Sequence, residues 1–336
     1  MADTYNVFHS PVEIAGQMGM LVKGLRQYGH KAFGYNTFRT FLNYSDHLQH
    51  TDLSNVVGEY HKYKKNIDIF HYHLSATLDS HYADLDEIVK MGKKMIMHHW
   101  GNDVRIEAAS KILSPFLGDP CNPCTDQLMI EKLKNISSRI KTAIIQDYEL
   151  HPYVRDYYEH IFILPLAYDA EMVVPSYPDP NKKVPLIIHA PTQPSFKGTA
   201  FIEAALTHLK QKGIAFEYKR IEYLSNAEAL QLYRQADIVI DQILVGTYGV
   251  FSVEAMALGK PVVCYIREDL LNTYPYPLPF IQANPITLAD QLERYLTDGE
   301  LRHTAGRKSR EYCLKVHDLN VVIPRLLEIY QFVMNT

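Results

Sequence analysis

The sequence is poor in three features that would place it outside the ordinary globular proteins. Only four cysteines occur in 336 residues, too few for a disulfide framework. No apolar run approaches the roughly 20 residues of a membrane span, and residues 1–10 lack the basic and hydrophobic layout of a leader peptide. A formal charge of −4 provides no basic surface for nucleic acid. We therefore expect a cytoplasmic protein that binds no nucleic acid.

The few cysteines predict little chemistry of their own. Cys121 and Cys124 form a single Cys-x-x-Cys motif, and no second pair stands at zinc-ribbon spacing. A redox or metal role for this pair stays open, but a proline-containing turn between helices is favoured. Cys264 and Cys313 lie in apolar patterns, which predicts buried packing residues.

What the chain does contain is a long alternation of strand and helix patterns. Its length suits two domains, and 47% apolar against 21% charged residues indicates a globular core. Such alternation is typical of doubly wound parallel sheets. Strands are predicted at 5–8, 31–35, 67–72, 94–98, 143–146 and 161–164, then at 186–190, 216–221, 237–244 and 262–266. Helices are predicted at 14–28, 85–91 and 126–140, then at 199–212, 226–235 and 251–258, with a helical tail over 288–336.

The segment 237–267 is the most informative part of the chain. An apolar, β-branched run of parallel-strand type ends in a turn that contains Gly246 and Gly249. A helix pattern follows over 250–258, ends at Gly259, and leads into a second apolar strand. Such a turn suits an anion, because unpaired N–H groups and the helix dipole face the loop. With Glu254 one turn inside the helix, the pattern predicts a site for a nucleotide with a diphosphate and ribose hydroxyls.

This segment resembles the donor-binding segment of GT-B glycosyltransferases, in particular the large retaining family 4. The resemblance is carried by GTYGVFSVEAMALGKPVV at 246–263. Four further segments agree in order and spacing: SPVEIAGQMGMLVKGLRQYGH at 10–30, HHWGNDVR at 98–105, HAPTQPSFKGT at 189–199 and EALQLYRQADIVID at 228–241. The match spans nearly the whole chain and is strongest over 186–267.

The resemblance implies an α/β fold of GT-B architecture, in which two Rossmann-like doubly wound domains face a cleft. The acceptor-side domain would comprise residues 1–166, together with a last helix at 319–336 that crosses back to it. The donor-binding domain would comprise residues 167–318. A proline-rich stretch at 165–185 has the composition of a linker between them.

The resemblance also gives two loops a role at the diphosphate. Gly16 opens the first long helix and would let the backbone approach the phosphates. Lys197 lies between a strand and a helix and would neutralise the charge that develops on the leaving diphosphate. The alternatives are an ordinary turn at Gly16 and a solvated surface lysine at 197. The arginine that many family members place five residues before the lysine is here Thr192.

By resemblance, Glu254 is the second acid of the family's Glu-x7-Glu motif and would hold the ribose hydroxyls. The first acid of that motif usually contacts the donor sugar, and Gly246 takes its place here. Recognition of the sugar would then rest on the backbone N–H groups of Tyr248, Gly249 and Val250.

Three other polar residues are candidates for the same site. Asp241 lies close to the motif but on a predicted strand and out of register with it. Glu222 and Tyr223 follow another predicted strand, and the resemblance places their loop near the nucleotide base, through backbone contacts or a ring stack. A helix cap at Ser225 or Asn226 would explain the same loop without a ligand.

His98 and His99 end a predicted strand and face opposite ways. In many relatives a cleft histidine directly precedes a glycine, a position that Trp100 takes here. The resemblance therefore extends that role to His99, which would hydrogen-bond the sugar or the acceptor hydroxyl. The alternative is half-buried packing beside a helix capped at 102–103.

His71 and His73 end another predicted strand and lie on the same face of it. Together with His98 they could form a zinc site, but histidines that cluster at strand ends rarely do. Family members generally work without a catalytic metal, so we expect no metal site.

The resemblance implies a glycosyltransferase that moves a sugar from a nucleotide-diphosphate sugar to an acceptor hydroxyl, with retention and without a cofactor, in cell-surface or other glycan biosynthesis. The acceptor would be a glycan, a lipid-linked molecule or a protein. No membrane span is expected, although peripheral membrane contact stays open. Two alternatives remain. One is a non-catalytic nucleotide-sugar binder or assembly subunit, favoured by Gly246 and Thr192; the other is a sugar-nucleotide epimerase of the same fold.

Overall fold

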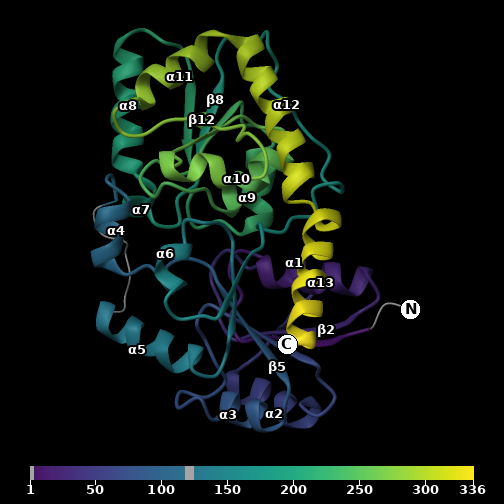
Figure 1. Cartoon of the computed structure of the whole chain (residues 1–336). Helices are drawn as coiled ribbons and strands as arrows, with labels where there is room; N and C mark the ends of the chain where they lie inside the picture. The colour runs from purple at the N-terminus through teal and green to yellow at the C-terminus, as the bar shows by residue number, and fades with distance from the viewer. Residues whose placement is uncertain (1–3, 118–124) are drawn as a thin grey trace. The chain divides into compact units, whose positions relative to one another are not determined.

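The computed structural model describes residues 4–117 and 125–336, which leaves Cys121 and Cys124 outside the described residues. The described residues divide into two compact units (Figure 1). Unit 1 comprises 4–109, 125–167 and 319–336, and unit 2 comprises 110–117 and 168–318. Within these ranges, no helix is both long enough and apolar enough to span a membrane.

Unit 1 is built on a parallel sheet of seven strands in the order β3-β2-β1-β4-β5-β6-β7. The strand order reverses between β1 and β4, so the carboxyl ends of these two strands mark the topological switch point, where α/β proteins bind ligands. The strands are β1 (Asn6–Ser10), β2 (Lys31–Asn36), β3 (Gln49–His50), β4 (Ile69–His73), β5 (Lys94–His99), β6 (Thr142–Ile145) and β7 (His160–Ile163).

Helices cover both faces of this sheet. On one face, α1 and α13 lie side by side, purple and yellow in Figure 1, and bury Leu21 and Ile323 against Ile69. On the other face, Tyr60 of α2 packs edge-on against Phe70. The helices are α1 (Gln17–Gln27), α2 (Leu53–Tyr63), α3 (Ala83–Lys90), α5 (Asp126–Ser137), α6 (His151–Val154) and α13 (Leu319–Asn335), while α4 (Glu107–Leu113) begins in unit 1 and ends in unit 2.

Unit 2 contains a second parallel sheet, of five strands in the order β12-β11-β10-β8-β9. Here the switch point lies between β8 and β10. The strands are β8 (Leu186–His189), β9 (Glu217–Arg220), β10 (Ile238–Ile240), β11 (Val262–Cys264) and β12 (Ile281–Gln282). The helices are α7 (Pro194–Lys197), α8 (Thr199–Gln211), α9 (Asn226–Tyr233), α10 (Val250–Ala257), the 3-10 helix η1 (Glu268–Thr273), α11 (Leu288–Thr297) and α12 (Gly299–Val316).

The core of unit 2 explains why one predicted strand is too long. The strand expected over 237–244 ends at Ile240, and the chain then continues as an irregular buried segment. Ile243, Leu244 and Val245 enter the same apolar cluster as Ile240. A short apolar run is buried in either conformation, so its composition does not separate a strand from a buried loop.

Candidate functional site

Lys197 and Asp241 meet at the switch point of unit 2. Lys197 is the last residue of α7, after β8, and Asp241 directly follows β10. The Lys197 Nζ lies 2.5 Å from the Asp241 Oδ1. The lysine side chain is 12% exposed and the aspartate side chain is fully buried. Lys197 is therefore held in a defined position at the carboxyl edge of the sheet, and Asp241 lies behind it.

The second carboxylate oxygen of Asp241 binds the beginning of α10. Asp241 Oδ2 accepts hydrogen bonds from the Ser252 hydroxyl at 2.6 Å and from the Gly249 N–H at 3.2 Å. Burial alone would raise the pKa of Asp241, but the Lys197 ammonium, with these two donors, holds that pKa below its ordinary value. Asp241 is therefore charged at neutral pH.

His189, the last residue of β8, holds the neighbouring elements together. Its Nδ1 donates to the Ile240 carbonyl at 2.8 Å, which leaves Nε2 to accept from the Thr199 hydroxyl at 2.8 Å. Burial lowers the pKa of His189 to about 4, so the ring is neutral. It joins the end of β8 to the end of β10 and to the first turn of α8, so it fixes the elements that flank Lys197 and the strand that leads to Asp241.

Glu254 lies inside α10 and is only 3% exposed, which excludes a helix-surface acid. Its Oε1 accepts from the side-chain amide of Asn226 at 2.6 Å. The sequence offered Ser225 or Asn226 as the cap of α9; the structure gives the cap to Ser225, which shares a capping box with Glu228. Asn226 instead orients the carboxylate of Glu254.

The turn before α10 explains the missing first acid of the motif. Gly246 has a φ of 92°, and a Cβ placed on it would lie 2.3 Å from the Cγ of Arg267. No side chain, acidic or otherwise, fits there without a local shift. Tyr248 is buried with its hydroxyl 3.1 Å from the His317 ring, so only its backbone can serve a ligand. Gly249 and Val250 are half-buried at the start of α10.

Glu222 and Tyr223 form the loop after β9. Glu222 accepts from the Arg220 guanidinium at 2.8 Å. Tyr223 is 81% exposed and has a φ of 58°, which is unusual for a residue with a side chain. The aromatic ring is thus presented to solvent in the loop that the family resemblance places near a nucleotide base.

In unit 1, the N–H groups expected to face a diphosphate bind a carboxylate of the chain itself. Gly16 precedes α1 with a φ of 80°, and the Gly19 N–H donates to Glu13 Oε2 at 2.8 Å. Glu13 is 5% exposed. Its burial raises the pKa to about 7, against the opposing effect of the backbone N–H groups at 16–19. A phosphate at this helix would have to displace Glu13.

Both ring nitrogens of His99 are engaged inside unit 1. Nδ1 lies 2.7 Å from Asp103 Oδ2, and Nε2 lies 2.8 Å from the Tyr158 hydroxyl. The residue is fully buried. His99 thus has the surroundings of a structural histidine, and it could reach a sugar only by giving up one of these bonds.

The remaining histidines at the switch point of unit 1 bind one another. Ring nitrogens of His9, His71 and His73 lie within 4.8 Å of one another, so among the described residues His9, which the sequence did not single out, takes the place of His98 in the metal-binding alternative. Burial lowers the pKa of these rings and of His98, that of His9 to about 3. In order of hydrogen-bonded contact, the members of this histidine chain are His73, His9, Tyr330, His71 and His98, with the Trp100 indole on His73.

One Asp-x-Asp pair occurs in the sequence, at Asp84 and Asp86. Asp84 accepts from the Tyr72 hydroxyl at 2.7 Å, whereas Asp86 pairs with the Arg139 guanidinium at 2.6 Å. The two carboxylates therefore serve separate structural contacts on α3.

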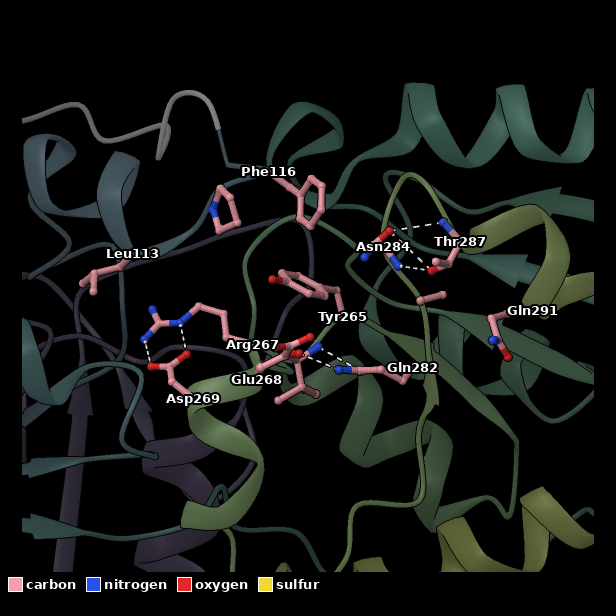
Figure 2. Close-up of a pocket in the computed structure, with 13 residues that line it drawn as sticks. Leu113, Phe116, Tyr265, Arg267, Glu268, Asp269, Gln282, Asn284, Thr287 and Gln291 are labelled. Atoms are coloured by element: carbon pink, nitrogen blue, oxygen red, sulfur yellow. Dashed lines mark hydrogen bonds and ion pairs between the residues drawn. The ribbon is translucent and has the colours of Figure 1, made fainter.

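A separate cavity of about 710 Å³ lies at the carboxyl ends of β11 and β12 (Figure 2). Tyr265 and Arg267 line it, but the Arg267 guanidinium pairs with Asp269 at 2.7 Å. The Gln282 amide accepts from the Ile266 N–H at 2.9 Å. None of the residues predicted for the donor site lines this cavity.

No family model and no curated protein matches the sequence. Solved structures do resemble it. Alr3699/HepE of Anabaena, in complex with UDP-glucose, has a TM-score of 0.66 at 13% identity, over 97% of this chain and 98% of that one. The catalytic domain of starch synthase IV from Arabidopsis thaliana, bound to ADP and acarbose, has a TM-score of 0.63 at 11% identity, over 99% and 100%.

MnaA of S. aureus, in a structure with UDP, is also similar, with a TM-score of 0.54 at 14% identity over 99% and 97% of the two chains. The chain has the GT-B fold. The predicted α/β class and GT-B architecture are thus confirmed, while membership of family 4 stays a prediction. Identities this low establish the fold of a GT-B protein and leave its activity to be inferred from the site.

Sequence reasoning missed the parts played by Asp241, Asn226 and Glu13. Asp241 is the first polar residue after an apolar parallel strand, which is where ligand-site residues are expected. Extending that strand to 244 concealed this signal. Asn226 and Glu13 gave no signal of their own, because each acts through a contact between segments that the sequence pattern does not pair.

Proposed function

We propose that the protein is a glycosyltransferase that binds a nucleotide-diphosphate sugar at the switch point of unit 2. The observation that carries this proposal is the arrangement around the first turn of α10. The pair of Lys197 and Asp241 touches the turn at Gly249, and the buried carboxylate of Glu254 lies one turn further along the same helix. A cation and backbone N–H groups suit phosphates, and a carboxylate suits ribose hydroxyls.

The roles of these residues follow from where they lie. Lys197 would contact the diphosphate, with the N–H groups of Gly249 and Val250 beside it. Glu254, oriented by Asn226, would accept hydrogen bonds from the ribose. The exposed ring of Tyr223 would stack on the base. Solved structures of similar fold carry UDP-glucose, UDP or ADP, which supports a nucleotide diphosphate as the donor group.

The reaction would break the bond between the anomeric carbon and the diphosphate and form a bond to the acceptor oxygen. The acceptor proton would pass to the leaving diphosphate, so no covalent intermediate with the protein is needed. Lys197 would stabilise the negative charge that grows on the leaving group. We further propose retention of configuration, independence of divalent metal, binding of the acceptor by unit 1, and a cytoplasmic role in glycan biosynthesis.

Ligand binding and turnover test this function directly. UDP, ADP, GDP and dTDP should be screened at millimolar concentration, and at least one should raise the melting temperature, because a ligand that binds only the native state stabilises it. The corresponding nucleotide sugar should be hydrolysed slowly without an acceptor, in EDTA as well as in Mg²⁺. Absence of any melting shift would count against the proposal, and strict dependence on metal would remove its metal-free part.

A non-catalytic nucleotide-sugar binder is the second candidate. It is favoured by the backbone at Gly246, where the family's first acid would not fit without a local shift, and by Thr192, which is exposed where many relatives carry an arginine. A melting shift with a nucleotide, together with no hydrolysis or transfer of its sugar, would decide for this candidate.

A further inference from the structure

The donor site proposed for unit 2 contains a buried negative charge where a site for diphosphate needs positive charge. Asp241 Oδ1 lies 2.5 Å from Lys197 Nζ, and Oδ2 is bonded to the Ser252 hydroxyl and the Gly249 N–H. These are the lysine and the helix turn that the proposed function assigns to the diphosphate. The chain's own carboxylate has therefore already taken the donors that a phosphate would use.

We propose that Asp241 is a resident counter-charge that weakens the binding of diphosphate at this site. The inference rests on the proposed function, since it concerns the same Lys197 and the same turn. It assigns to Asp241 no contact with the sugar or with the reacting atoms. Asp241 acts through Lys197, as a residue that limits how strongly the site holds its anion.

Asp241 has no means of withdrawing when an anion arrives. Its side chain is fully buried, and both carboxylate oxygens are held by partners on α7 and α10. The Lys197 side chain is 12% exposed whereas that of Asp241 is not exposed, so an anion from solvent reaches the lysine first. A diphosphate that approaches Lys197 therefore meets a second negative charge directly behind the ammonium. Attraction and repulsion act over similar distances in a medium of low dielectric, so much of the lysine's attraction is offset.

The benefit of such an offset lies in turnover. Product release limits the rate of many enzymes, and a nucleoside diphosphate held by an unopposed lysine and a helix N-terminus would leave slowly. Asp241 thus favours release of the product diphosphate.

Asp241→Asn tests this inference, with inorganic pyrophosphate and UDP as probes measured by calorimetry. The change removes the charge but keeps an oxygen that can accept from Gly249 and Ser252. We expect the Kd for pyrophosphate to fall about tenfold, which corresponds to about 1.4 kcal/mol. A purely structural role for Asp241 would weaken binding or leave it unchanged, and either result overturns the inference.

Asp237→Asn is the matched control. Asp237 precedes β10 as Asp241 follows it, is buried, and pairs with Lys182 at 2.5 Å. The three residues of β10 lie between the two aspartates, which puts their Cα atoms about 13 Å apart, far beyond the contact distance of Asp241 and Lys197. Asp237→Asn should therefore leave the Kd for pyrophosphate unchanged. If both variants tighten binding equally, overall charge explains the effect and the inference fails.

If Asp241→Asn does not fold, the neutral pair Lys197→Gln with Asp241→Asn replaces it. An affinity for pyrophosphate within about threefold of wild type would show that the two charges cancel, and a weaker affinity would refute this.

Binding of UDP separates this inference from the proposed function. Tighter pyrophosphate without any binding of UDP or of another nucleotide supports the counter-charge and defeats the proposed function. Binding of UDP with no change in either probe on Asp241→Asn defeats the counter-charge alone.

Discussion

The two units place the same local structure at their switch points, but the pKa of its buried carboxylate is shifted in opposite directions. In each, a glycine turn leads into a helix whose first N–H groups bind a buried carboxylate, Glu13 at α1 and Asp241 at α10. Asp241 has the ammonium of Lys197 beside it and keeps a lowered pKa. Glu13 forms no salt bridge with any residue in the described ranges, and its burial raises the pKa to about 7.

This difference shows what a glycine turn before a helix does and does not specify. The turn specifies that several N–H groups point at one place and attract negative charge. Whether that charge belongs to a ligand or to the chain depends on a carboxylate that the turn itself does not contain. A cation beside the carboxylate then lowers its pKa and favours the ionised form.

The largest expected effect comes from removing the Lys197 ammonium, the partner of Asp241 in unit 2. Lys197→Ala leaves Asp241 charged and buried without its partner, which should cost about 3–5 kcal/mol of unfolding free energy. Urea unfolding measures this loss. Adding Asp241→Asn to the same variant should recover most of it.

Lys212→Ala is the control for that loss. Lys212 pairs with Glu293 on the surface, with side chains 40% and 31% exposed, and its removal should cost less than about 1 kcal/mol. Equal costs for the two lysine variants would mean that the charge state of Asp241 does not depend on Lys197, and the contrast between the units would disappear.

The second effect concerns Glu13 and the pH dependence of stability. The folded-state pKa of Glu13, about 7, lies above the ordinary 4.5, so its contribution to stability is complete below pH 4.5 and is lost as pH rises through 7. Between pH 4 and pH 8 the wild type should lose about 3 kcal/mol from this group. Glu13→Gln should remove that part of the slope in urea unfolding, and an identical slope in both proteins would contradict the raised pKa.

The third effect separates the two ends of the proposed donor. Lys197→Ala should lower kcat about 100-fold, because Lys197 acts on charge that grows in the transition state. Glu254→Gln should raise the KM for the donor about tenfold with a smaller change in kcat, because ribose is held equally in both states. Steady-state kinetics of Glu13→Gln, measured alongside, shows which unit binds the donor. A donor KM that responds to Glu13 and not to Glu254 would move the donor site to unit 1.

The smallest effect is expected at the loop after β9. Tyr223→Ala should weaken nucleotide binding about fivefold through loss of a base stack, in the range of about 1 kcal/mol. Its 81% exposure predicts no change in stability. Tyr28→Ala, an exposed tyrosine of unit 1, should change neither property. Equal nucleotide affinities for the two variants would remove Tyr223 from the site.

The sequence patterns predicted the fold well because alternating apolar strands and helices leave few arrangements of a parallel sheet. They failed where an element is too short to have a pattern. The edge strands at Gln49–His50 and Ile281–Gln282 have two residues each and were not predicted. The strand predicted at 237–244 was too long because the buried loop that follows β10 is as apolar as a strand.

The site was predictable only in part. The motif placed Lys197 and Glu254 at the carboxyl edge of unit 2, because strand ends fix their positions along the chain. It could not show that Asp241 contacts Lys197, since that contact depends on how far β10 extends and which way the next residue turns. The backbone at Gly246 shows why an acid is absent there, a fact that only the φ angle and the neighbouring Arg267 reveal.

The histidine chain of unit 1 has a polarity that one residue sets. The Trp100 indole can only donate a proton, so Nδ1 of His73 accepts and Nε2 of that ring carries the hydrogen. In each following contact the Nε2–H of one ring donates to Nδ1 of the next, except that between His9 and His71 the Tyr330 hydroxyl accepts from the first ring and donates to the second. Every imidazole of the chain is therefore the Nε2–H tautomer. A metal bound to Nε2 of His73 would move that ring's proton to Nδ1, where it would face the Trp100 indole N–H. A single tryptophan thereby decides the tautomer of His98 at the far end of the chain.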